Sequence, residues 1–248
     1  MAGNVRIKVQ RRDGPDAPAR WETFEVEPEP LMNVISCLQA IQRRPVTVEG
    51  KEVAPVAWEC SCLEEICGAC TMIINGRVRQ ACSALVESLS QPIELRPMSK
   101  FPVVRDLVVD RSVMFDALKK VRAWVDIDGT HDLGFGPRQS QDDQSVTYPL
   151  SKCMTCGCCV EACPNYHEGS PFIGPQAASQ VRLFNAHPSG QQHAHERLET
   201  LMGIGGVAYC GKSQNCVEVC PKEIPLTDSL ASVNRAIVKH MLTRWLRR

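Results

Sequence analysis

The fourteen cysteines of this 248-residue chain constrain its fold more than any other feature. They form an early group and a late group that are separated by seventy residues. The early group is Cys37, Cys60, Cys62, Cys67, Cys70 and Cys82, and the late group is Cys153, Cys156, Cys158, Cys159, Cys163, Cys210, Cys216 and Cys220. The N-terminal residues show no targeting pattern, so we expect a reducing compartment, where clustered cysteines bind metal more often than they form disulfides.

Charge and hydrophobic patterning exclude two broad classes of function. Lysine plus arginine and aspartate plus glutamate balance at 28 each, and this argues against nucleic acid as a partner, because phosphate binding favours a basic excess. No run of about 18 apolar residues is present, so no membrane-spanning helix is expected.

The first part of the chain is predicted to be β-rich. Apolar residues alternate over residues 5–9 and recur over 21–26, which indicates a hairpin. A helix is expected over 32–42. Asn75-Gly76 lies between Thr71–Ile74 and Arg77–Ala81 and is a strong hairpin signal, and 93–95 supplies a further strand.

The second part of the chain carries almost no strand signal. The spacing of Leu107, Met114, Leu118, Val121 and Val125 predicts an amphipathic helix after Pro102. Segment 129–150 is rich in Gly, Pro, Asp, Gln and Ser and is expected to be irregular. Further helices are predicted over 177–185, 194–202 and 227–245.

The early cysteines follow the plant-type [2Fe–2S] ferredoxin spacing. Four residues separate Cys62 from Cys67, two separate Cys67 from Cys70, and Cys82 follows after eleven more. The hairpin at Asn75-Gly76 would return the chain to supply the fourth thiolate. A tetrahedral zinc site is the alternative, although such sites usually pair two CxxC units.

The late cysteines begin with the bacterial ferredoxin run. Cys153, Cys156, Cys159 and Cys163-Pro164 match it residue for residue. In that run the first three cysteines bind one cluster and the fourth binds the other.

The partner half of the run lacks one cysteine. Cys210, Cys216 and Cys220 keep the spacing, but Ser213 stands at the second position. By the ferredoxin crossing rule, Cys220 completes a [4Fe–4S] site with Cys153, Cys156 and Cys159. The remaining cysteines are Cys163, Cys210 and Cys216. They supply three thiolate ligands, the number that suits a [3Fe–4S] cluster; a serine-ligated [4Fe–4S] cluster is the alternative.

The other chemically active residues have simpler explanations. Cys37, Cys60 and Cys158 are expected to be non-ligands. Glu64-Glu65 is interpreted as a pair of solvated charges, and His193 with His195 as a polar loop, with a stray metal site as the alternative. The basic, partly apolar residues 239–248 would contact a membrane surface or an anchor subunit, or form a solvated terminus.

A [2Fe–2S] loop followed by a two-cluster segment with one missing cysteine closely resembles the iron–sulfur subunits of succinate dehydrogenase and fumarate reductase, respiratory complex II. The resemblance covers nearly the whole chain, through CLEEICGACTMIINGRVRQAC, RPMSKFPVVRDLVVDRS, CMTCGCCVEACPN, FIGPQAASQVRLFNAHP and CGKSQNCVEVCPKEIPL. The expected fold class is α+β, with a plant-type ferredoxin β-grasp domain (1–103) followed by an all-α, bacterial-ferredoxin-like domain (104–248).

The resemblance implies an electron relay and its partners. FAD in a flavoprotein subunit would oxidise succinate, and electrons would pass through the [2Fe–2S], [4Fe–4S] and [3Fe–4S] clusters to a quinone at a cytochrome b anchor subunit that holds haem b. This chain would carry no catalytic residue of its own. The complex would lie at the cytoplasmic face of the bacterial inner membrane, with this chain as a peripheral subunit.

One departure from the family pattern bears on the quinone. Many ubiquinone-reducing members have a tryptophan near the position of Glu168 and a histidine where Gly211 follows Cys210. The resemblance is therefore strongest to the menaquinone-using, haem-anchored bacterial branch. Fumarate reduction, a free multi-cluster ferredoxin-like carrier and a zinc-binding interaction module are the alternative functions.

Overall fold

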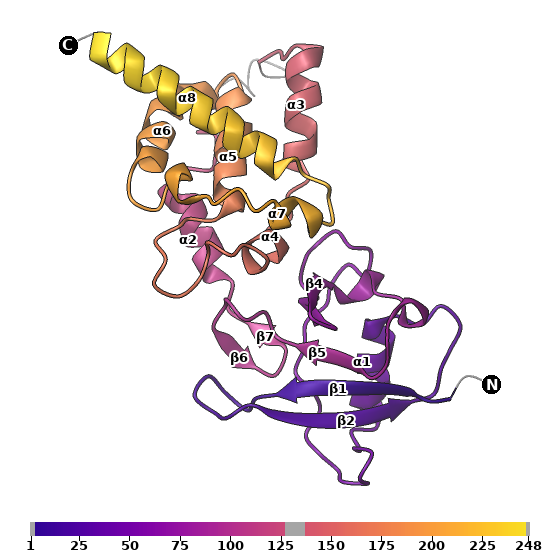
Figure 1. Cartoon of the computed structure of the whole chain (residues 1–248). Coiled ribbons are helices and arrows are strands. Elements are labelled where there is room, and N and C mark those ends of the chain that lie inside the picture. The colour runs from indigo at the N-terminus through magenta and orange to yellow at the C-terminus, as the bar shows by residue number, and fades with distance from the viewer. Residues whose placement is uncertain (1–2, 127–136, 247–248) are drawn as a thin grey trace. The chain divides into compact units, whose positions relative to one another are not determined.

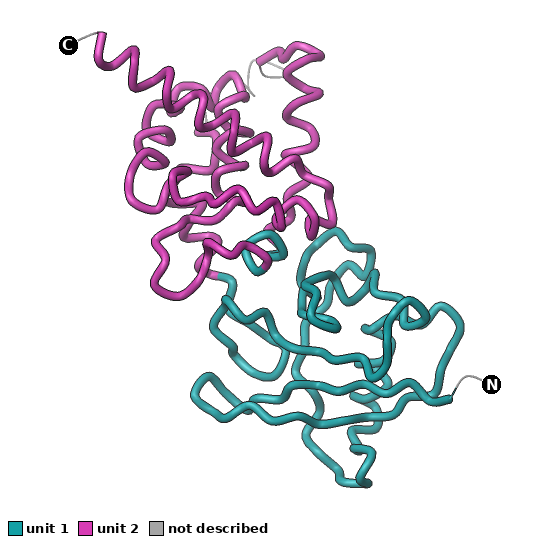
Figure 2. Tube along the Cα trace, viewed as in Figure 1, with its two compact units in different colours: residues 1–111, 156–161 teal, residues 112–155, 162–248 magenta. Residues whose placement is uncertain are grey.

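The computed structural model describes residues 3–126 and 137–246, which form two compact units (Figures 1 and 2). Unit 1 comprises Met1–Arg111 and Cys156–Glu161, and unit 2 comprises Ser112–Thr155 and Ala162–Arg248. The short late segment that belongs to unit 1 carries two of the cysteines of the ferredoxin run. The domain division expected at 103/104 stays a prediction, since the units divide at 111/112.

Unit 1 is built on a five-stranded mixed sheet with the strand order β2-β1-β5-β3-β4. Its strands are β1 (Val5–Arg11), β2 (Arg20–Val26), β3 (Thr71–Ile74), β4 (Arg77–Gln80) and β5 (Ile93–Arg96). β1 pairs antiparallel with β2 and parallel with β5, and β3 pairs antiparallel with both β4 and β5. The two predicted hairpins are therefore confirmed.

Helix α1 (Val34–Arg43) supplies the other half of the unit 1 core, as predicted for residues 32–42. The alternation along β1 buries Val5, Ile7 and Val9. These side chains belong to the same apolar cluster as Leu38 and Ile41 of α1. Asn33 caps the helix, because its side chain accepts a hydrogen bond from the backbone N–H of Ser36.

A small second sheet replaces the start of the helix that was predicted over 107–125. β6 (Val103–Arg105) and β7 (Val108–Val109) pair around a turn in which Asp106 has φ 45°. Helix α2 begins only at Ser112 and ends at Lys120. The prediction was wrong for residues 107–111, because the buried turn at Asp106 determines the local structure in place of the helical spacing. It was also wrong for residues 121–125, which follow the end of α2.

Unit 2 is helical and packs around α5 (Pro175–Ala186) (Figure 1). α5 and α6 (Ala194–Met202) contact α8 (Leu226–Leu246), the longest helix. The core includes Val181 of α5, Leu198 and Leu201 of α6, and Val233 and Ile237 of α8. The three helices predicted over 177–185, 194–202 and 227–245 are confirmed. Among the described helices, none has the length and apolar character required to cross a bilayer.

The segment predicted to be irregular contains a helix. Residues 129–136 of that prediction lie outside the described residues, but α3 (Gln141–Ser151) follows them. Ser140 caps α3 through a bond from the backbone N–H of Asp143 at 3.0 Å. The polar composition of α3 and its internal Pro149 concealed the helix in the sequence. The prediction was wrong there.

A buried ion pair links the β6–β7 turn to β1 of the five-stranded sheet. The Arg11 and Asp106 side chains are both fully buried, and Arg11 Nε donates to Asp106 Oδ1 at 2.9 Å. Asp106 also accepts the backbone N–H of Arg12 and of Ala57, at 3.0 and 2.8 Å. One carboxylate therefore connects β1, the β6–β7 turn and the chain that leads into residues 62–69, which we call the Cys62 loop.

Replacing Asp106 with alanine should destabilise unit 1 strongly. The change leaves the Arg11 guanidinium buried beside Glu22 and backbone carbonyls only, and breaking a buried pair costs about 3 kcal/mol or more. Urea unfolding of the cluster-loaded protein measures the loss. Asp13→Ala is the matched control, because its pair with Arg20 is solvent-exposed and should leave the unfolding free energy unchanged. Equal effects of the two variants would contradict this account.

Candidate iron–sulfur sites

The Cys62 loop wraps backbone N–H groups around a sulfur atom. The N–H groups of Glu64, Ile66 and Cys67 point at Cys62 Sγ with N···S distances of 3.3–3.4 Å, and the Ala69 N–H donates to Cys67 Sγ at 3.4 Å. These bonds, first that from Glu64, lower the pKa of Cys62 to about 7. The loop therefore favours a thiolate, which is the form that binds iron.

Left-handed backbone conformations give the loop its curvature. Leu63, Glu65 and Gly68 have φ angles of 61°, 55° and 74°. Gly68 also meets a close neighbour, since a Cβ atom added there would lie 2.7 Å from Cys156 Cβ and 2.8 Å from Cys156 Cα. Glycine is therefore required at this position for both its φ angle and its size.

The β3–β4 hairpin and helix α1 together position the other two cysteines of the early set. Cys70 precedes β3, and Cys82 lies in the 3₁₀ turn η1 (Ala81–Ser83) that follows β4. The Ala81 N–H donates to the Cys70 carbonyl at 3.1 Å, and the Asn33 side-chain amide donates to the Cys82 carbonyl at 3.0 Å. The cap residue of α1 therefore also fixes η1.

The buried sulfurs of this group fit a cationic centre. Burial, with the adjacent Cys82 sulfur, raises the pKa of Cys70 to about 12. Two neighbouring buried thiols resist ionisation together unless a positive charge compensates them. Iron supplies that charge, so the donor set and its burial suit a [2Fe–2S] cluster.

The segment Cys156–Glu161 is held in unit 1 by a carboxylate and a glycine. Glu161 accepts the backbone N–H of Ser99 and of Lys100, each at 3.0 Å, and the Ser99 hydroxyl. Gly157, with φ 93°, lies against Met98 and Phe101, whose nearest atoms would be 3.2 Å from an added Cβ. Two cysteines of the late ferredoxin run are thereby fixed on the first unit.

Gln80 of β4 connects this segment to the early cysteines. Its side-chain carbonyl accepts the thiol of Cys70 at 3.6 Å, and its amide donates to Cys158 Sγ at 3.5 Å. Cys158 is fully buried, and its S–H donates to the sulfur of Cys156, which lowers the pKa of Cys156 to about 7. A buried amide therefore lies between cysteines of the two sequence groups, within unit 1.

The cysteines predicted for the [4Fe–4S] site are divided between the units. Cys156 and Cys159 belong to unit 1, whereas Cys153 and Cys220 belong to unit 2. The Ile224 N–H donates to Cys220 Sγ at 3.5 Å, which is a further backbone bond to a sulfur. That these four cysteines bind one cluster stays a prediction.

Unit 2 gathers the three cysteines predicted for the [3Fe–4S] site. Burial, together with the charges of Cys163 and Cys210, raises the pKa of Cys216 to about 11. The Lys212 N–H donates to Cys210 Sγ at 3.4 Å. Ser213, which stands where the second cysteine of this half-run would be, is exposed in a loop. Cys163 and Cys210 are thus near enough to Cys216 to influence its charge, and that the three bind one cluster stays a prediction.

Sequence reasoning missed the residues that support these cysteines. Gln80, Glu161 and Asn33 have no spacing signature, although Glu161 is a rare buried acid within an otherwise conventional motif. Glu64 is exposed as expected, but Glu65 accepts the Ser83 hydroxyl at 2.5 Å, so it fastens the Cys62 loop to η1 and is not merely a solvated charge.

The fold and the sulfur groups define an iron–sulfur electron-transfer protein with a sheet-based unit followed by a helical one. Two family models match accordingly: a 2Fe-2S iron-sulfur cluster binding domain over residues 5–116 and a 4Fe-4S dicluster domain over 149–224. The chain carries [2Fe–2S] and [4Fe–4S] domains, and its remaining cysteines are consistent with a third cluster.

Curated relatives place the chain more closely. It is 58% identical over 231 residues to the succinate dehydrogenase iron-sulfur subunit of Bacillus subtilis, covering 93% of this chain and 91% of that protein. It is 27% identical to the fumarate reductase iron-sulfur subunit of Wolinella succinogenes, covering 96% and 99%. A chain of the Mycobacterium smegmatis Sdh1 complex in the apo form has the same fold, with a TM-score of 0.75, 22% identity and coverage of 96% and 97%. The protein belongs to the family of succinate dehydrogenase iron–sulfur subunits.

Gly68→Ala should destabilise unit 1 more than the matched change Gly76→Ala. Both glycines have positive φ angles, 74° and 80°, so both variants carry a left-handed strain of about 1–2 kcal/mol. Only Gly68 faces another backbone, since nothing lies within 4 Å of a Cβ at Gly76. Denaturant unfolding and the yield of bound iron measure the difference. Equal loss in both variants would show that the Cys156 contact is unimportant.

Proposed function

We propose that this chain is the electron-transfer subunit of a succinate dehydrogenase, with three clusters held by eleven cysteines. Cys62, Cys67, Cys70 and Cys82 would bind [2Fe–2S], and Cys153, Cys156, Cys159 and Cys220 would bind [4Fe–4S]. Cys163, Cys210 and Cys216 would bind [3Fe–4S]. When bound, such clusters accept and release single electrons at potentials set by hydrogen bonds, burial and charge.

The backbone N–H groups that point at cysteine sulfurs in both units carry this proposal. N–H groups aimed at Cys62, Cys67, Cys210 and Cys220 stabilise negative charge on the sulfurs. Gln80 would hold Cys158 through its amide hydrogen bond, whereas Cys70, as a thiolate ligand of iron, would no longer donate to the Gln80 carbonyl. Cys158 would remain a thiol that donates to Cys156, because its own pKa is raised chiefly by that hydrogen bond.

The exposed surface of each unit fits a different partner. Leu63 and Ile66 project from the Cys62 loop and are 48% and 56% exposed, which suits docking of an FAD-containing flavoprotein on unit 1. On unit 2, Leu242 and Trp245 are 58% and 73% exposed near the end of α8. They suit a membrane-anchor cytochrome b subunit, which would keep the chain at the cytoplasmic face of the bacterial membrane.

A cleft next to Cys210, one of the cysteines assigned to [3Fe–4S], also favours binding of the anchor subunit to unit 2. It has a volume of about 910 Å³ and is lined by Cys210, Lys212 and Gln214 together with residues of α8 such as Leu230 and Leu242. The cleft would receive part of the anchor, and the quinone, which we propose to be menaquinone, would be reduced there or within the anchor itself. An exposed apolar helix end favours a bound subunit over a free carrier.

Ser213→Cys should convert the three-iron site toward four iron atoms. A fourth thiolate at this position restores the ferredoxin spacing, so the EPR signal of the oxidised [3Fe–4S] centre should fall and the iron content should rise. Ser213→Ala is the control, and it should leave the signal and the iron content unchanged. An unaltered signal in Ser213→Cys would contradict the ligand assignment, and loss of iron in Ser213→Ala would indicate serine ligation.

Co-purification with tagged full-length chain tests the function itself. The unaltered chain should recover both a flavoprotein and a cytochrome. Leu242→Glu with Trp245→Glu should reduce cytochrome recovery by about tenfold or more while flavoprotein recovery stays the same, because charged groups replace apolar contacts. Leu63→Glu with Ile66→Glu should do the reverse. Recovery of neither partner by the unaltered chain would count against a complex II subunit.

A further inference from the structure

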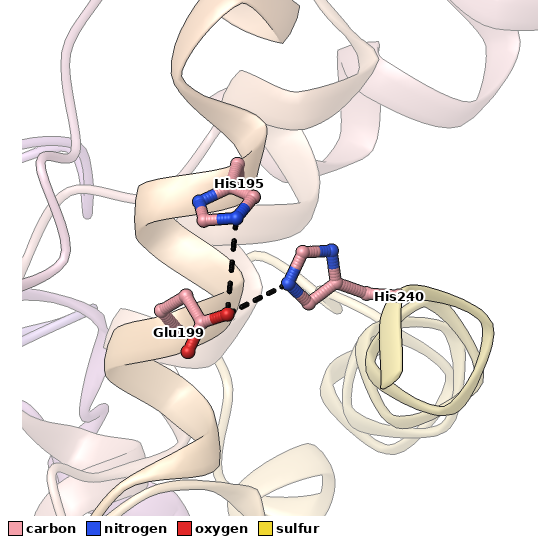
Figure 3. A group of neighbouring side chains, drawn as sticks. All are labelled: His195, Glu199 and His240. Carbon is pink, nitrogen blue, oxygen red and sulfur yellow. Dashed lines mark hydrogen bonds and ion pairs between the residues drawn. The ribbon is translucent and has the colours of Figure 1, made fainter. Parts of the chain in front are cut away.

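Three metal-binding side chains meet on the surface of unit 2, outside the cysteine groups. His195 and Glu199 lie one turn apart on α6, and His240 lies on the neighbouring α8 (Figure 3). Both imidazole rings point a nitrogen at the same oxygen of Glu199 (Figure 3). His240 Nε2 is 2.8 Å from Glu199 Oε1 and His195 Nε2 is 3.8 Å from it, and all three donor atoms lie within 4.8 Å of one another.

This geometry differs from the loop that the HxH sequence predicted. His193 and His195 do not act together, because His193 precedes α6 and its ring lies against Asp126 and Glu196. His195 lies within the helix and therefore faces the same side as Glu199, four residues later. The third residue, His240, is forty-five positions away in sequence and carries no spacing signal.

Two imidazoles and one carboxylate form a familiar donor set for a divalent transition metal. Zn²⁺ in three-ligand protein sites accepts two histidines and a glutamate, at distances of about 2.0–2.2 Å, and keeps a water at the open position. The His195 side chain is 67% exposed, so it is free to close the remaining distance, and solvent reaches the fourth position. The His240 side chain is only 15% exposed and is held in place by the helix packing.

We propose that His195, Glu199 and His240 form a binding site for a divalent transition metal ion of the zinc type, which links α6 to α8. The ion replaces the hydrogen bond between His240 and Glu199 with two bonds to the metal. The site is separate from the cysteines assigned to iron, and its ligands are nitrogen and oxygen only. Binding stabilises unit 2, because an ion that binds the folded state alone shifts the unfolding equilibrium.

Arg244 competes with the metal for the same carboxylate. Its Nη1 atom lies 2.8 Å from Glu199 Oε1 and 3.1 Å from Oε2. A cation at the site must displace or neutralise this contact, since guanidinium and metal repel each other. Removing the guanidinium therefore strengthens metal binding, whereas removing a ligand weakens it. These opposite directions distinguish a metal site from a simple network of hydrogen bonds.

Zinc binding to the cluster-loaded full chain under anaerobic conditions tests the proposal. Equilibrium dialysis with Zn²⁺ should give one site whose affinity falls at least tenfold in His195→Ala, His240→Ala and Glu199→Gln, since even the loss of a residue that only orients a ligand costs about 10–100-fold. Arg244→Gln should raise the affinity. His193→Ala is the matched control and should leave it unchanged. Zinc bound by cysteines contributes equally in every variant, so a difference in zinc affinity between variants reports on the site at His195, Glu199 and His240.

X-ray absorption at the zinc edge identifies the ligands independently. Nitrogen and oxygen neighbours near 2.0–2.1 Å are expected, and sulfur neighbours near 2.3 Å would assign the zinc to cysteines instead. A rise in melting temperature with Zn²⁺ should occur in the unaltered chain and disappear in His195→Ala, whose exposed side chain is dispensable for folding. Unchanged affinity in His195→Ala and His240→Ala, or weaker binding in Arg244→Gln, would overturn the proposal.

Discussion

The negative charge of thiolates packed close together is the constraint on which this structure depends. Burial and the neighbouring Cys82 sulfur raise the pKa of Cys70, and burial with the charges of Cys163 and Cys210 raises the pKa of Cys216. Only a strongly positive centre makes such groups stable as ligands, and the backbone adds N–H donors around Cys62 for the same purpose. The sheet, the β3–β4 hairpin and the helices position the short loops that carry these cysteines.

The supporting residues explain how a ferredoxin run distant in sequence becomes part of the first unit. Glu161 bonds to Ser99 and Lys100, and Gln80 bonds to Cys158, so the segment Cys156–Glu161 is integrated into the sheet-based unit (Figure 2). The absence of a side chain at Gly68 allows the Cys62 loop to approach Cys156 directly. The same few residues that shape one sulfur group therefore position cysteines of the next, which is what a fixed electron path requires and a free carrier does not.

Much of this could be predicted from the sequence, because the strongest signals are local. Alternating apolar residues gave β1 and β2, Asn75-Gly76 gave the β3–β4 hairpin, and helical spacing gave α1, α5, α6 and α8. The failures occurred where tertiary contacts outweigh local pattern. Asp106, buried against Arg11, imposes a turn where a helix was expected, and the capping of α3 by Ser140 was concealed by polar composition. The pairing of His195 and Glu199 with His240 depends on how two helices pack, and no spacing in the sequence encodes it.

Electron transfer by this chain depends on the number and type of its clusters. Mössbauer spectroscopy of the full chain, reconstituted with ⁵⁷Fe in the absence of oxygen, measures every iron atom whatever its spin state. The spectrum should contain three components, assignable to [2Fe–2S], [4Fe–4S] and [3Fe–4S] centres, with iron in the ratio 2:4:3. A spectrum with fewer than three kinds of centre, or a chain that takes up zinc in place of iron at these cysteines, would contradict this assignment.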